Sequence, residues 1–247
     1  KEHKVIIHPQ FGEGGDFKLL GCLVDDSLSM KSQIERIFGK VRPRIAAMKR
    51  TCTHYNAESM LDQYKSQIWG FLEFTNGCIC HAISSELDRI DSMQRGFLHC
   101  VHMNDKIAFL EFNFAPPCLR RDVGMLGLIH KRVLGIAHPA YSLLLDYYHG
   151  PVQARFHSKA LDNRRGEIIY QRDLFNRSIF GYVDVYNRLP PYIIDYKTVS
   201  DFQHELTVIC KRRCRQGCES WMHSFNMYRR GFDATVFNVD PVLAAVR

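Results

Sequence analysis

The segment from Lys31 to Arg50 most constrains the fold of this chain, because its apolar residues recur at the spacing of an amphipathic helix. The turn-forming residues Asp25-Asp26-Ser27 precede it and supply a helix N-cap. Pro43 interrupts the pattern and predicts a kink near residues 39–41. The positions predicted to face a core are Ile34, Ile37, Phe38, Val41, Ile45 and Met48. We therefore predict a long helix that is apolar on one face and basic elsewhere.

Two segments carry concentrated positive charge. On the first helix the candidate nucleic-acid-binding residues are Lys31, Arg36, Lys40, Arg42, Arg44, Lys49 and Arg50, and in the second segment they are Lys211, Arg212, Arg213 and Arg215. The formal net charge of +7 and the pI of about 8.9 favour an anionic partner such as nucleic acid. Cations spaced along a helix suit a phosphate backbone. They are equally typical of a solvated helix face, and both interpretations stay open.

The residues before the first helix predict β-structure. The apolar run from Phe17 to Val24 reads as a buried strand, with Gly21 marking a bulge or a close backbone approach. We expect it to pair with a strand at Lys4 to His8 across a glycine-rich loop. Because two strands alone are marginally stable in water, this end should be the least stable part.

The remaining sequence is mainly helical in pattern. Asn56 caps a second helix, Ser84 or Ser85 opens a third, and Pro116-Pro117 starts a fourth that Gly135 ends. Further helices are predicted at 141–148 and 199–216, strands at 167–170 and 179–186, and a loosely ordered tail from Trp221 onward. The predicted fold class is mainly α: a helical bundle preceded by a short β-hairpin, with a small β element near residues 167–186.

Several phrases, in this order, resemble one known family. They are the strand, acidic turn and basic helix that begin at Asp16, the run Leu61 to Leu72, Pro117-Cys118-Leu119-Arg120-Arg121, Arg177-Ser178-Ile179-Phe180, Tyr186-Asn187-Arg188-Leu189-Pro190, and Ser200 to Phe202. Together they look like the thumb and C-terminal region of a reverse transcriptase of the non-LTR retrotransposon kind. Tyr186 stands where that family has Trp, and the last spacing is shorter.

The resemblance implies a fragment of an RNA-directed DNA polymerase. Residues 1–30 would be a hairpin remnant of the palm and primer grip, 31–149 a thumb-like bundle, and 150–247 a post-thumb region with its basic helix at 199–216. The partners it implies are RNA, DNA and a missing upstream polymerase domain that binds Mg²⁺. It also implies a nuclear location if the chain acts as the family does.

The pair Asp25-Asp26 has the form of a polymerase metal motif. Two-metal chemistry needs a further carboxylate from another strand, and the acids upstream, Glu2, Glu13 and Asp16, lie beside turns or the terminus. We therefore expect a turn here, no catalytic residue, and neither enzymatic activity nor a cofactor in this chain.

The nine cysteines lack a metal-binding or catalytic pattern. Cys210, Cys214 and Cys218 recur every four residues along a predicted helix, so they cannot all reach one zinc ion. Cys78-Ile79-Cys80-His81 lacks a second pair, and no signature supports a nucleophile with His102 or His130. Without a signal segment or an apolar run of about 18 residues, we expect reduced thiols, an intracellular location and no membrane span. The alternative function is a non-functional remnant or a domesticated protein-interaction module with no nucleic-acid role.

Overall fold

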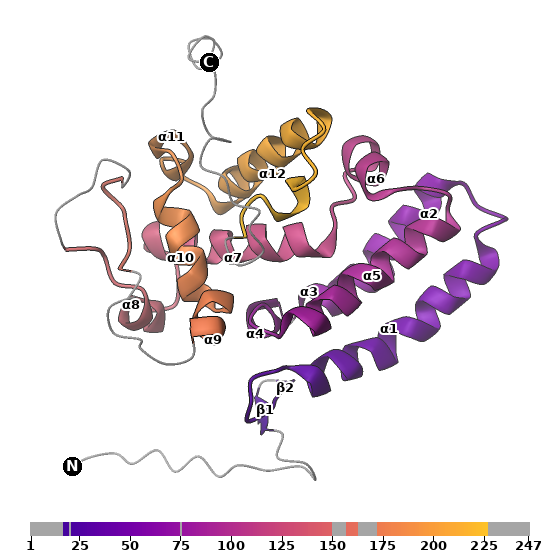
Figure 1. Ribbon diagram of the computed structural model, residues 1–247, viewed down its shortest axis with the longest axis horizontal. Helices are drawn as coiled ribbons and strands as arrows, with labels where there is room; N and C mark the ends of the chain where they lie inside the picture. The colour runs from indigo at the N-terminus through magenta and orange to yellow at the C-terminus, as the bar shows by residue number, and fades with distance from the viewer. Residues whose placement is uncertain (1–16, 20, 75, 150–156, 163–171, 227–247) are drawn as a thin grey trace. The chain divides into compact units, whose positions relative to one another are not determined.

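The computed structural model describes residues 17–19, 21–74, 76–149, 157–162 and 172–226 (Figure 1). It is mainly helical with an antiparallel hairpin near the N-terminus, as the sequence predicts. The chain divides into two compact units, residues 1–90 and 91–247. The domain boundaries expected after residues 30 and 149 come from the resemblance to parts of a reverse transcriptase, and they remain predictions.

The hairpin of the first unit is shorter and more local than predicted. Strand β1 (Phe17–Leu19) pairs with β2 (Cys22–Val24), so that Phe17 lies opposite Val24. The chain reverses at Gly21, whose φ of +84° lies in the region that glycine adopts without strain. Phe17 to Val24 is therefore a hairpin in itself rather than one strand. The partner strand expected at Lys4 to His8 lies outside the described residues.

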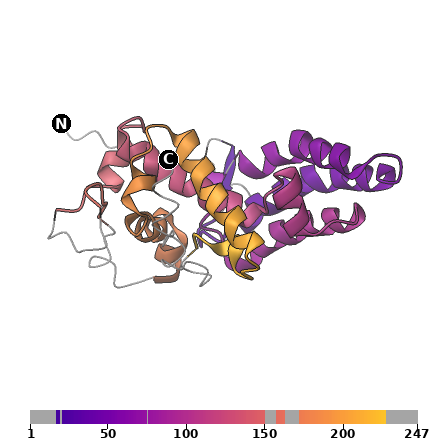
Figure 2. The same ribbon diagram turned by 90° about the horizontal axis from the view of Figure 1, so that it is seen from above.

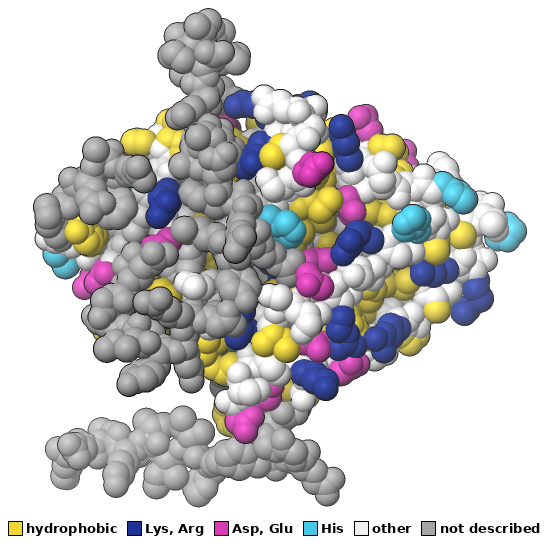
Figure 3. Space-filling model, viewed as in Figure 1, with side chains coloured by type: hydrophobic (Ala, Val, Ile, Leu, Met, Phe, Trp, Pro, Cys, Tyr) yellow, Lys and Arg dark blue, Asp and Glu magenta, His cyan; other side chains and the backbone are white. Residues whose placement is uncertain are grey.

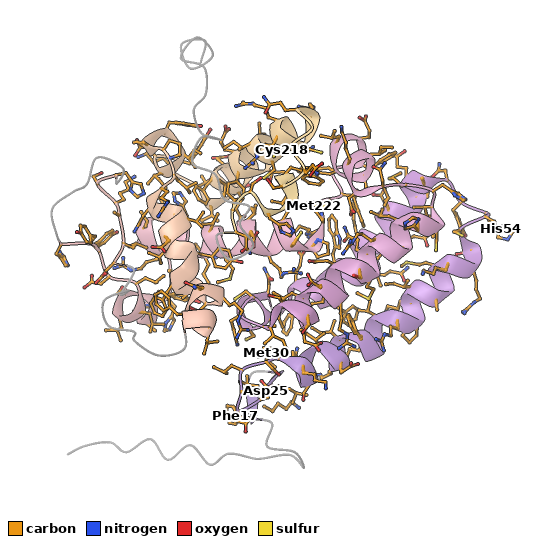
Figure 4. The ribbon with its side chains drawn as sticks, in the orientation of Figure 1. Phe17, Asp25, Met30, His54, Cys218 and Met222 are labelled. Carbon is orange, nitrogen blue, oxygen red and sulfur yellow. The ribbon has the colours of Figure 1, made fainter. Side chains whose placement is uncertain are left out.

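Helix α1 (Lys31–Thr51) confirms the predicted helix and runs continuously past Pro43. Its buried residues include the whole predicted apolar stripe: Ile34, Ile37, Phe38, Val41, Ile45 and Met48. The preceding residue, Met30, is left-handed with φ of 61°. Its backbone N–H donates to Asp25 Oδ1 at 3.0 Å. The Asp25 carboxylate thus stabilises the entry to α1 from five residues upstream (Figure 4).

The rest of the first unit folds against α1. Helix α2 (Ala57–Tyr64) continues through a π-helical turn, η1 (Lys65–Trp69), into α3 (Gly70–Glu73), and α4 (Asn76–Ile79) and the start of α5 (Ser84–Cys100) follow. Asn56 caps α2 as predicted, accepting from Ser59 N at 2.8 Å. Residues of η1 and α3 pack beside α1 (Figures 1 and 2). Met60, Leu61, Tyr64, Ile68 and Leu72 are buried there.

The second unit is built around α7 (Pro117–Val133), which packs against α10 (Ile179–Asn187) and α12 (Val199–Arg215). Its other elements are α6 (Asp105–Phe112), α8 (Ala140–Leu144), α9 (Arg172–Arg177), α11 (Pro191–Ile194) and η2 (Trp221–His223). Two predicted starts are confirmed: Pro117 opens α7, and α12 begins at Val199, where Thr198 caps it by accepting from Asp201 N at 3.1 Å. Gly135 follows α7 with φ of +74°, as the expected stop requires.

The strand predicted at residues 179–186 is wrong, because this segment is the helix α10. Ser178 caps it and accepts from Phe180 N at 3.3 Å. Tyr182 through Asn187 are all buried, so the helix shows no amphipathic period and its aromatic and β-branched residues mimic a strand. The other half of the predicted β element, 167–170, lies outside the described residues.

The start of the predicted loose tail is packed. Trp221 stacks on Phe109 of α6 with ring centroids 4.9 Å apart, and Phe225 is buried. Residues 227–247 lie outside the described part of the chain. Among the helices described, none is both long enough and apolar enough to span a bilayer.

Candidate nucleic-acid interface

The predicted cations of α1 lie on the surface. Lys31, Lys40, Arg42, Arg44, Lys49 and Arg50 are exposed, and Arg36 is half-buried. Figure 3 shows Lys and Arg side chains, in dark blue, following one another along the surface that α1 forms. The stripe between them is the buried apolar face, so the helix separates charge from core as the sequence predicts.

On one side of α1 the cations are paired with acids. Arg42 Nη1 lies 4.0 Å from Glu35 Oε2, and Arg89 contacts both Glu35 and Glu86. The guanidinium groups of Arg42 and Arg89 lie 4.8 and 4.9 Å from the centroid of the Phe38 ring. The hydrogen bond from Arg89 leads the effects that lower the pKa of Glu35. This charge is therefore largely compensated within the unit.

On the other side the cations lie over an aromatic ring but, within the described structure, are not paired with acids. Arg44 lies 4.4 Å and Lys40 6.0 Å from the centroid of Phe71. Among the residues that the structure describes, no carboxylate lies within 4 Å of either cation. Their charge is therefore available to an anion from outside.

Lys40 borders a groove with a volume of about 330 Å³ between the hairpin, α1 and α3. It is lined by Gly21, Gln33, Arg36, Ile37, Lys40, Gly70, Phe71 and Phe74. Two hydrogen bonds fix its hairpin side: Arg36 Nη1 donates to Gly21 O at 2.6 Å, and Leu23 N donates to Gln33 Oε1 at 3.0 Å. Phe74 is 80% exposed at its rim. The groove thus holds an open aromatic ring together with Lys40, which has no carboxylate partner in the described part of the chain.

The groove can accept a nucleotide by two kinds of contact. An aromatic face stacks on a base, and this attraction tolerates every base because each has a π-face. Ammonium and guanidinium groups bind phosphate, and a guanidinium can do so through two hydrogen bonds. Phe74 with Lys40 and Arg44 supplies both groups within one unit.

The cations at the end of α12 are not equivalent to one another. Lys211 Nζ lies 5.6 Å from the centroid of the Phe109 ring, Arg212 is half-buried, and Arg215 is exposed. Arg213 is only 8% exposed and bonds to Cys218 Sγ at 3.2 Å and Ser220 Oγ at 3.4 Å. The prediction that Arg213 faces a phosphate is therefore wrong in this structure, because the chain after α12 folds back over it.

Two of the phrases that resemble the polymerase family, those that contain Arg121 and Tyr186, form interior contacts of the second unit. Arg121 forms a buried ion pair with Asp91, with Nη2 and Oδ1 3.0 Å apart. Although burial alone would lower the pKa of Arg121, the Asp91 carboxylate raises it. Tyr186 is fully buried, with its hydroxyl 2.9 Å from His130 Nδ1. These residues hold helices together and present nothing to a ligand.

The acidic turn is used by the fold. Asp25 accepts from Met30 N and from the hydroxyl groups of Ser27 and Ser29, whereas Asp26 is exposed. Partial burial alone would raise the pKa of Asp25, but these hydrogen bonds outweigh it and lower the value. Within the described residues, no group of three or more His, Cys, Asp or Glu side chains converges in a way that could hold a metal ion.

Sequence reasoning missed the aromatic half of the groove. Neither Phe71, which is half-buried, nor the exposed Phe74 is among the candidate binding residues of the sequence. The sequence carries only a weak signal for this part of the groove. Phe74 follows the apolar residues of α3, a helix that packs against the basic helix α1. No known protein family, curated protein or solved structure matches this chain. A functional assignment therefore rests on the groove and on the cations around it.

Proposed function

We propose that this chain binds RNA and DNA through α1 and the groove beside it, as the thumb and C-terminal part of a non-LTR reverse transcriptase would. The observation that carries the proposal is a groove lined by Lys40, Phe71 and the exposed ring of Phe74, with the Arg44 guanidinium over the same Phe71 ring. Cations paired with carboxylates, as Arg42 is with Glu35, are what a solvated face alone would show.

The binding should be non-specific in sequence. Lys40 and Arg44 attract phosphates, which are identical in every nucleotide, and Phe74 offers a stacking surface rather than hydrogen-bond donors aimed at base edges. The end of α12, where Arg215 is exposed and Lys211 and Arg212 are half-buried, would make further backbone contacts. The chain itself would supply no chemistry, and nucleotidyl transfer with Mg²⁺ would belong to an upstream polymerase domain.

The salt dependence of binding tests the role of the cations. A fluorescent single-stranded oligonucleotide is titrated with the full chain at several salt concentrations. The logarithm of affinity should fall with the logarithm of salt by about 0.7 per phosphate contact. Replacing Lys40 and Arg44 with Gln should make this slope shallower by about one unit. Replacing Lys211, Arg212 and Arg215 with Gln tests α12 in the same way.

Arg42→Gln is the matched control, because Arg42 lies on the same helix but is paired with Glu35. It should change the slope less than either single replacement at Lys40 or Arg44. If the parent and the Lys40/Arg44 variant had equal salt slopes and equal melting temperatures, these cations would contact only solvent and not the nucleic acid. That outcome would favour the remnant or protein-interaction module.

Phe74→Ala tests stacking. Loss of one base–aromatic contact costs about 1–3 kcal/mol, so affinity should drop roughly tenfold while the salt slope stays constant. Tyr55→Ala is its control, because Tyr55 is also an exposed aromatic residue of the first unit, 52% exposed, and does not line the groove. Equal losses in the two variants would contradict a binding role for the groove.

A further inference from the structure

Arg213, in the last turn of α12, is a buried cation without a carboxylate partner. It is 8% exposed, and no carboxylate of the described residues lies within 4 Å of its guanidinium. One of its terminal nitrogens, Nη1, is buried with no hydrogen-bond partner in the described structure. A buried charge is unfavourable unless an opposite charge compensates it. The surroundings of Arg213 therefore favour an anion.

The group that Arg213 faces is a thiol. Its Nη2 lies 3.2 Å from Cys218 Sγ, and Ser220 Oγ lies 3.3 Å from the same sulfur. The turn that follows α12 produces this arrangement. Gly217 is left-handed with φ of +78°, and Cys218 N donates to Arg213 O at 3.2 Å, which brings the sulfur back over the helix end (Figure 4).

Cys218 differs in two ways from the buried cysteines near it in sequence. Cys210 and Cys214 are buried, and burial raises the pKa of Cys210 to about 12 and raises that of Cys214 as well. Cys218 is only partly buried, so reagents can reach it. Its pKa is lowered, first by the hydrogen bond with Ser220 and then, against partial burial, by the hydrogen bond with Arg213.

We infer that Cys218 is a reactive thiol of this chain and a site of oxidation by small hydroperoxides, with Arg213 as the counter-ion of its thiolate. A cationic neighbour and partial exposure are the surroundings in which a thiolate forms and reacts. The site lies in the second unit and does not depend on nucleic-acid binding.

The oxidation is a two-electron transfer. The Cys218 thiolate attacks the terminal oxygen of the hydroperoxide, an S–O bond forms, and the O–O bond breaks. The immediate products are the sulfenic acid of Cys218 and an alkoxide, or hydroxide when the oxidant is hydrogen peroxide. The sulfenic acid then gives its proton to this leaving group, which yields the sulfenate and the alcohol or water. The negative charge passes from sulfur to the new oxygen, so Arg213 still faces an anion after the reaction.

The test compares alkylation rates of individual cysteines in the folded full chain. Limiting iodoacetamide is added between pH 6 and 9, and the labelled positions are identified by peptide mass spectrometry. Cys218 should be labelled first at pH 7, ahead of Cys52 and Cys100, which are also partly exposed. Its rate should reach half of its maximum below the usual thiol pKa of about 8.5.

Arg213→Gln and Ser220→Ala should each raise that midpoint. A thiolate gains nucleophilicity as its pKa rises, which offsets part of the smaller thiolate fraction, so the rate at pH 7 should fall about threefold per pKa unit. Arg215→Gln is the matched control, because Arg215 is exposed two residues further along α12 and has no contact with Cys218. Ser220→Ala keeps the test decisive if the loss of Arg213 unfolds the chain.

Hydrogen peroxide followed by dimedone, which traps sulfenate, should label Cys218 in the parent. This label should disappear in Cys218→Ser. Labelling of Cys52 or Cys100 ahead of Cys218, or a Cys218 midpoint unmoved by Ser220→Ala, would overturn the inference.

Discussion

The side-chain amide of Asn187 is hydrogen-bonded to both backbone groups of Leu161. Nδ2 donates to Leu161 O at 2.7 Å, and Oδ1 accepts from Leu161 N at 2.9 Å. Both residues are buried. His157 makes a third bond to the same helix end, with Nε2 3.2 Å from Tyr186 O. The segment 157–162 is thus fixed to the end of α10 by side chains.

Asn187→Asp should destabilise the second unit. The carboxylate cannot donate to Leu161 O, and it places a buried negative charge beside that carbonyl, so we expect a loss of about 2–3 kcal/mol or more. Urea unfolding of the full chain measures it. Asn104→Asp makes the same chemical change where Asn104 caps α6 by accepting from Ile107 N, and should be nearly neutral. Similar losses in the two variants would contradict the role of the Asn187 donor.

Arg121→Met should cost about 3–5 kcal/mol, because it removes the guanidinium from the buried ion pair with Asp91. The double variant with Asp91→Leu should recover much of that loss. Asp195→Asn is the surface comparison, since Asp195 pairs with Lys159 at 3.2 Å but is 67% exposed, and should cost at most about 1 kcal/mol. If the double variant were as unstable as the sum of its two single variants, the pair would not be coupled.

Stability should fall as the pH is lowered from about 7.5 to 5. Burial lowers the pKa of both His130 and His157 below the usual 6.5, so the unfolded chain takes up protons that the folded chain resists. Each histidine should contribute up to about 1.4 kcal/mol per pH unit between 6.5 and its folded pKa. Urea unfolding at several pH values measures the slope, which His130→Gln should make shallower. An unchanged slope in that variant would show that folding does not lower the pKa of His130.

Asp25→Ala should destabilise the first unit by about 1 kcal/mol, because the start of α1 loses its acceptor for Met30 N. Asp26→Ala should be neutral, since Asp26 is exposed. We expect the chain to show no primer extension on an RNA template with Mg²⁺ or Mn²⁺. Template-dependent extension abolished by both substitutions would make these aspartates catalytic and contradict the structural role of Asp25.

The sequence predicts elements well where the signal is local. Asn56 and Thr198 mark the starts of α2 and α12, and Pro117 marks the start of α7, since each acts on backbone groups within a few residues. The apolar stripe of α1 is likewise readable because one face is buried and the rest is solvated.

Three of the failures depend on distant packing. Helix α10 is surrounded by other elements, so the contrast between faces that identifies a helix is missing. Arg213 occupies a sequence position typical of a solvated cation, and its burial is decided by the fold of the residues after α12. Phe74 joins the candidate site only because α3 packs on α1, which no local pattern contains.

The π-helical turn η1 determines which way Phe71 and Phe74 point. A π turn acts as a one-residue insertion in an α-helix, and each residue of an α-helix advances by about 100° around the axis. Because Lys65–Trp69 precedes both aromatic residues, deletion of one residue there would restore regular α-helix. The rings would then turn by about 100° relative to α2. The groove thus depends on the helical phase of η1 as well as on the residues that line it.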